Sequence, residues 1–218
     1  MIIEFVGRSG VGKSVIASAL RKALVDKGYS ASCVNPMARG WYRFWFIGFW
    51  YGSLLCLRLR VKTYYGLRRL PTTIARIAVW RDLKDVVISD QNLFQTISSL
   101  VIRNLVWEDP RLVADGLAVV PREFLPDVVI HVRAAPQTIA DRRKRYRGGG
   151  SEAFETKIRG KARIEEFINA MNLTRDEEKP LRYMELQNEG DACIHDLAQL
   201  VIEGIFVDVG GVKKGRGQ

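Results

Sequence analysis

The stretch FVGRSGVGKS, residues 5–14, matches the phosphate-binding pattern G-x-x-x-x-G-K-[ST]. In such a loop, glycines let successive backbone N–H groups converge on phosphate oxygens at the positive end of a helix. Lys13 would reach the β- and γ-phosphates of a nucleotide, and the Ser14 hydroxyl would ligate Mg²⁺. A glycine-rich turn before a core helix is the alternative, but it does not explain Lys13 and Ser14 together. The residues expected to bind the nucleotide are Gly7, Arg8, Ser9, Gly10, Val11, Gly12, Lys13 and Ser14.

A carboxylate ends the later apolar stretch DVVISD, residues 85–90. Asp90 beside the phosphate loop could hold the metal through water or accept a proton from an attacking hydroxyl. Alternatively, it caps a helix that begins near Gln91. Both roles are compatible, and we expect Asp90 to serve as a metal ligand or base, with Gln91 beside the acceptor.

The segment DRRKRYRGGG, residues 141–150, places a run of cations before three glycines. Cations at a helix C-terminus gain only about 0.3–1 kcal/mol each from the macrodipole, which gives no reason for so many. Arginines on a mobile flap can stabilise the oxygens of a transferring phosphoryl group, and the glycines could form its hinge. The rival interpretation is a solvated basic helix end. The candidate catalytic arginines are Arg143, Arg145 and Arg147.

Short apolar stretches alternate with segments of helical spacing along the chain. The expected strands are residues 1–6, 30–35, 85–90, 127–132 and 182–187. Helices are expected from residue 13 to a stop at Gly28, after Asp90, from Pro136, and over residues 192–205. This alternation predicts a parallel sheet covered on both faces, with ligands at the carboxyl ends of its strands. Both Gly7 and Asp90 follow such ends.

At 218 residues, one domain is the default, and its net charge of +10 is unevenly placed. Residues 36–81 include no Asp or Glu but eight arginines and Lys62. Such a field attracts phosphates, nucleic acid or an anionic membrane; a basic rim around an anionic substrate is the simpler interpretation. No nucleic-acid-binding module is recognised, so we expect no nucleic-acid partner. Three separated cysteines favour free thiols in a reducing, cytoplasmic compartment, and we expect no cleaved signal before the first strand.

These motifs, GRSGVGKS, VVISDQ and the arginine-rich segment, resemble those of the P-loop nucleoside and nucleotide kinases, thymidylate kinase most closely. The resemblance implies an α/β P-loop NTPase fold, a three-layer αβα sandwich with a five-stranded parallel sheet in the order 2-3-1-4-5. It implies ATP and Mg²⁺ as cofactors, Asp90 beside the acceptor, and a lid that carries the arginines of the cationic run. Arg8 differs in place from the family's P-loop arginine, so the catalytic arginine is expected in the lid. QNEGD, residues 187–191, occupies the family's adenine-contact position.

The expected kinase domain is residues 1–207, with an acceptor subdomain at about 37–84, a lid at about 142–157 and a disordered tail at 208–218. One departure concerns the acceptor. The family usually has Asp-Arg after the third strand, whereas this chain has Asp90-Gln91, and glutamine cannot neutralise a phosphate. The acceptor is therefore either a hydroxyl or a phosphate held elsewhere, for which the candidates are Arg39, Arg43 and Arg76.

A second departure is the aromatic segment around residues 41–51, where eight of eleven residues are aromatic. The uncharged run of residues 44–57 falls short of the roughly 20 residues that a membrane-spanning helix needs. It could lie in a membrane interface, form a buried helix of the acceptor subdomain, or mediate a homodimer. Peripheral membrane contact through residues 41–62 is the hypothesis with a functional consequence.

These inferences predict an ATP-dependent phosphotransferase that moves the γ-phosphate to a nucleotide or other small acceptor. Two alternatives stay open. One is a kinase of a hydrophobic or lipid-linked hydroxyl at the membrane surface. The other is an ATPase or switch module in which Gln91 positions water. A lid that excludes water favours a kinase.

Overall fold

Five strands form one parallel sheet in the order β2-β3-β1-β4-β5. The strands are β1 (Ile2–Val6), β2 (Ala31–Cys33), β3 (Val86–Ser89), β4 (Val128–Arg133) and β5 (Arg182–Gln187). The predicted strand order and direction are confirmed. This computed structural model describes residues 1–7, 9–33, 45–59, 61, 64–81, 85–90, 93–102, 118–147, 181–189 and 193–206.

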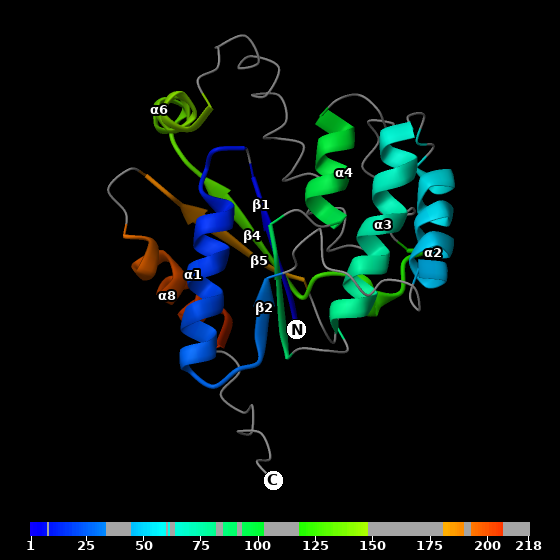
Figure 1. Cartoon of the computed structure of the whole chain (residues 1–218), viewed down its shortest axis with the longest axis horizontal. Helices are drawn as coiled ribbons and strands as arrows, with labels where there is room; N and C mark the ends of the chain where they lie inside the picture. The colour runs from blue at the N-terminus through cyan, green and yellow to red at the C-terminus, as the bar shows by residue number, and fades with distance from the viewer. Residues whose placement is uncertain are drawn as a thin grey trace.

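Helices cover both faces of the sheet, which confirms the predicted three layers (Figure 1). Helices α1 and α8 lie on one face, whereas α2, α3 and α4 lie on the other, and α6 lies beyond the carboxyl end of β4. The helices are α1 (Lys13–Asp26), α2 (Trp45–Arg58), α3 (Tyr64–Arg81), α4 (Leu93–Ile102), α6 (Pro136–Arg147) and α8 (Ile194–Phe206), with a 3₁₀ turn η1 at Arg122–Phe124.

The central strands β1, β3 and β4 are buried on both sides, because successive side chains of a strand point to opposite faces of a covered sheet. In β1, Ile3 and Phe5 join the core beneath α1 and α8. Ile2 and Val6 join the second core, beneath α2, α3 and α4. Two cores back to back hold the sheet rigid, so the loops at its carboxyl edge start from fixed positions.

Helices α2 and α3 approach each other at a glycine and a proline. A Cβ atom on Gly52 would lie 2.2 Å from the Cα atom of Pro71, so only glycine fits this contact. This contact positions α2, which packs with one side on α3 and forms an outer edge of the helical layer. No helix in the described part of the chain is both long and apolar enough to cross a bilayer.

Several predicted boundaries shift by a few residues. Among the described residues, the second strand is Ala31–Cys33, and the last helix begins at Ile194. Residues 37–44 of the predicted acceptor subdomain, the glycines and far end of the predicted lid, and the tail at 208–218 lie outside the described residues. The division into subdomain, lid and tail therefore stays a prediction.

Candidate functional site

The phosphate loop joins the end of β1 to the start of α1, as the sequence predicts. Gly7 has φ +141° and Gly12 has φ +95°, in the region that favours glycine. A Cβ atom on Gly7 would lie 2.4 Å from the carbonyl oxygen of Val132, and one on Gly12 would lie 2.4 Å from Nδ2 of Asn188. Both glycines are therefore required by close approach as well as by conformation.

Lys13 closes the loop on itself. Its Nζ atom donates a hydrogen bond of 2.9 Å to the carbonyl oxygen of Gly7. Burial lowers the pKa of Lys13 to about 8, while the nearby charge of Asp90 acts in the opposite direction. An anion bound in the loop would restore the pKa of this ammonium group, so the site favours a negatively charged ligand.

Ser14 and Asp90 meet across the sheet edge, although 76 positions separate them in the sequence. The Ser14 hydroxyl donates a hydrogen bond to Oδ2 of Asp90. A hydroxyl and a carboxylate oxygen from two elements are ligands that Mg²⁺ accepts when waters and phosphate oxygens complete its octahedron. The described residues include no group of three or more His, Cys, Asp or Glu side chains, so a metal here would draw on a nucleotide.

Helix α4 holds the first residue of the loop. Oε1 of Gln95 accepts a hydrogen bond of 3.0 Å from the backbone N–H of Gly7. The backbone N–H of Gln95 in turn donates to Oε1 of Glu4, a fully buried carboxylate of β1, at 2.8 Å. The helix after Asp90 is thus tied to the strand before the loop.

The far side of the loop is held by the segment after β5. Nδ2 of Asn188, a buried side chain, donates a hydrogen bond of 2.7 Å to the carbonyl oxygen of Val11. Arg142 of α6 donates to the same carbonyl at 3.3 Å and to Oδ1 of Asn188 at 3.3 Å. One backbone carbonyl of the loop therefore connects β5 and α6.

Glu189 fixes the start of α6, the helix that carries the cationic run. Its carboxylate accepts hydrogen bonds from the backbone N–H of Ala135 at 3.0 Å and from the Thr138 hydroxyl at 3.2 Å. The bond from Ala135 is the main reason that the pKa of Glu189 is lowered, and a bond from Gln187 adds to it. The segment after β5 thus holds both the loop and α6.

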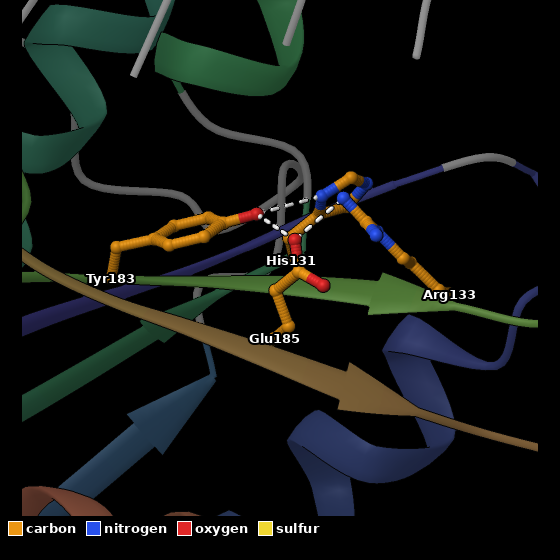
Figure 2. Close-up of polar contacts among 4 residues, drawn as sticks. All are labelled: His131, Arg133, Tyr183 and Glu185. Carbon is orange, nitrogen blue, oxygen red and sulfur yellow. Dashed lines mark hydrogen bonds and ion pairs between the residues drawn. The ribbon is translucent and has the colours of Figure 1, made fainter. Parts of the chain in front are cut away.

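A polar cluster lies on the face of the sheet that α4 covers (Figure 2). His131 of β4 and Tyr183 of β5 form a hydrogen bond of 3.0 Å, and the Tyr183 hydroxyl donates to Glu185 at 2.8 Å. Arg133 pairs with the same Glu185 oxygen at 2.5 Å. His131 is buried.

No protein-family model matches the sequence, and no curated protein matches it. Solved structures do match. Deoxyadenosine kinase from M. mycoides with bound dATP aligns with a TM-score of 0.55 and 19% identity, over 93% of this chain and 98% of that chain. Thymidylate kinase from Candida albicans aligns with a TM-score of 0.51 and 15% identity, over 95% of this chain and 92% of that chain. The chain has the fold of the P-loop nucleoside and nucleotide kinases.

Within this kinase fold, the described residues bring Lys13, Ser14 and Asp90 together. Arg76 lies half-buried in α3. Arg143, Arg145 and Arg147 belong to α6, as the helical prediction required, but their side chains are not described. Arg8, Arg39, Arg43 and Gln91 lie outside the described residues.

Sequence reasoning missed four residues that hold the loop between β1 and α1: Glu4, Gln95, Asn188 and Arg142. A signal existed for Glu4, because a charged residue inside the apolar stretch MIIEFV must find a partner when buried. Asn188 follows a strand end, where ligand-binding and loop-holding groups gather in this class of sheet. Nothing in the sequence distinguished Arg142 from the other cations of its run.

Proposed function

We propose that this protein is an ATP- and Mg²⁺-dependent phosphotransferase of the nucleoside and nucleotide kinase type. The observation that carries the proposal is the meeting of Lys13 with the Ser14–Asp90 pair at the mouth of a glycine-dependent loop. A loop that only bound phosphate would not need a carboxylate from the end of another strand, β3, beside the Ser14 hydroxyl that would ligate Mg²⁺.

In this proposal, the backbone N–H groups of residues 7–14 hold the phosphates, and Lys13 neutralises the charge that develops on the transferring group. Ser14 and Asp90 would hold Mg²⁺, which supplies charge neutralisation and orientation of the phosphates when bound. Asp90 would also orient the acceptor hydroxyl or accept its proton. Arg143, Arg145 and Arg147 would act from the lid, and residues 187–191 would contact the base.

The acceptor proposed is a nucleoside, a nucleotide or another small molecule. The deoxyadenosine kinase of M. mycoides is described with dCMP and dCDP, and the thymidylate kinase of Candida albicans with broad substrate specificity. Gln91 in place of an arginine weakens the case for a thymidylate phosphate, so Arg39, Arg43 or Arg76 would have to hold an acceptor phosphate.

A second candidate is phosphorylation of a hydrophobic or lipid-linked hydroxyl. The observation that favours it is the exposure of large apolar side chains on α2, within the predicted acceptor subdomain. The free thiols Cys33, Cys56 and Cys193 support the proposed reducing, cytoplasmic location.

ADP release from ATP with and without acceptors tests the proposal. The panel would hold nucleosides, nucleoside monophosphates, sugars and polyprenols. Turnover with one acceptor class, and loss of that turnover in Lys13→Met but not in the exposed-lysine control Lys22→Met, is expected. Turnover at the same rate without any acceptor would replace the kinase with an ATPase.

A further inference from the structure

One side of α2 carries large apolar side chains that are exposed to solvent. Phe46, Phe49, Trp50 and Leu57 are between 51% and 82% exposed. At about 100° per residue these positions fall within an arc of about 100° on one side of the helix. Gly52, Leu55 and Cys56 are buried and fall in the neighbouring arc of the helix, which borders the exposed arc at Phe49.

This surface is unusual in its chemistry as well as its exposure. Single exposed apolar residues are normal on a protein surface, whereas three aromatic side chains at spacings of three and four residues on one side of a helix are neighbours and mark an interaction site. Phenylalanine and tryptophan beside arginines are typical of a helix that lies in the headgroup region of a bilayer. Arg58, at the end of α2, is exposed next to Leu57.

Charge decides which partner fits. Residues 36–81, the part of the sequence that contains α2, include eight arginines and one lysine and no acidic residue, so α2 belongs to a segment of one charge sign. A symmetric dimer through the same surface would bring these like charges together. An anionic bilayer complements them, and each cation near its surface adds to the attraction.

The dimensions of α2 set its orientation. Its 14 residues span about 21 Å, which is short of the roughly 30 Å hydrocarbon core of a bilayer. The helix is also anchored by its buried side to α3, with Gly52 against Pro71. It can therefore lie along a membrane surface while the rest of the fold stays in water.

We propose that the outer side of α2 docks on the surface of an anionic lipid bilayer, with Phe46, Phe49, Trp50 and Leu57 in the interface and Arg58 against the headgroups. The docking does not depend on the proposed phosphoryl transfer. It would bring the kinase fold to a surface where a lipid-linked acceptor is available. The docked helix is connected to the phosphate loop, because α2 contacts α3, α3 contacts α4, and α4 holds Gly7.

Co-sedimentation of the full chain with phosphatidylcholine vesicles, with and without phosphatidylglycerol, tests this docking. We expect binding to the phosphatidylglycerol vesicles at low salt, and weaker binding at an ionic strength of about 0.15 M. The variant Phe46→Ser/Trp50→Ser should lose at least about tenfold in vesicle affinity, because two large side chains no longer enter the interface. The matched control is Leu200→Ser, which removes a side chain that is 52% exposed on α8, across the sheet.

Thermal unfolding of each variant verifies folding, which changes at exposed positions should preserve. Absence of vesicle binding at low salt, or an equal loss in Leu200→Ser, would overturn the proposal. A concentration-dependent dimer that the α2 variant dissociates, without vesicle binding, would assign the surface to a second copy instead. ATP turnover with soluble acceptors is measured separately, so failure of docking and failure of the kinase proposal are distinguishable.

Discussion

The hydrogen bond from Asn188 to the carbonyl of Val11 offers a direct test of how the phosphate loop is held in shape. Asn188→Ala removes the 2.7 Å bond from a buried amide and leaves the carbonyl with the 3.3 Å bond from Arg142. Loss of the main partner of a buried acceptor costs about 1–3 kcal/mol. We therefore expect the free energy of unfolding to fall by about 2 kcal/mol.

The same change should weaken phosphate binding, because the loop must then be ordered by the ligand. We expect the Kd for ATP and the Kd for inorganic tripolyphosphate, both from calorimetry, to rise by at least about fivefold. Tripolyphosphate separates the effect on the loop from any lost contact with the base. Arg142→Ala alone should cost about 1 kcal/mol or less, since its bonds are long and its side chain is partly exposed.

The double variant Asn188→Ala/Arg142→Ala removes both side-chain donors to the Val11 carbonyl. Asn188→Ala leaves the Arg142 bond on that carbonyl, so the loss of stability in the double variant should exceed that of Asn188→Ala alone by about 1 kcal/mol. Gln199→Ala, which removes an exposed amide–carboxylate hydrogen bond on α8, serves as the control and should change stability by about 0.5 kcal/mol or less. Asn188→Ala with unchanged stability and unchanged tripolyphosphate affinity would refute the reasoning.

Three further predictions follow from individual contacts. Lys13, with a pKa of about 8 in the free protein, is already protonated below that pH. Magnesium-free ATP affinity should therefore fall by about tenfold per pH unit above pH 8 as Lys13 loses its proton, with proton uptake on binding visible by calorimetry in different buffers. A flat profile from pH 8 to about pH 9.5 would contradict it. Gly52→Ala should destabilise the fold by about 1–3 kcal/mol, because the new Cβ atom would meet the backbone of Pro71. The control Gly204→Ala meets only the flexible end of a methionine side chain and should be near neutral. Equal unfolding midpoints for the two variants would contradict the close contact between α2 and α3. Iodoacetamide should modify the exposed Cys193 far faster than the buried Cys56, because burial raises the pKa of the Cys56 thiol to about 12. Equal labelling of the two cysteines in mass spectra would contradict the burial of Cys56 in α2.

The layers of the fold were predictable because the central strands β1, β3 and β4 are short, largely apolar stretches followed by helical spacing. Gly7 and Asp90 both lie at strand ends, so their proximity followed from the rule that parallel strands present their carboxyl ends at one edge. The sheet order itself came from the family resemblance, and it is confirmed.

The contacts that hold the site were not predictable in the same way. Asn188 and Val11 are 177 positions apart, and no periodicity links a strand-end asparagine to one particular backbone carbonyl. The exposed side of α2 was also hidden in the sequence, because apolar residues occur on every side of that helix and only packing on α3 decides which side is buried. The roles of Arg143, Arg145 and Arg147 stay predictions.

Transfer of the labelled γ-phosphate of ATP tests the central claim most directly. The protein is incubated with labelled ATP and an acceptor panel, and the label is followed into product for the parent chain, Lys13→Met and Asp90→Asn, with the exposed Asp196→Asn as control. The account predicts label in one acceptor class, loss of at least about a hundredfold in Lys13→Met and Asp90→Asn, and full activity in the control. Label found only as inorganic phosphate, or equal transfer by all four proteins, would contradict it.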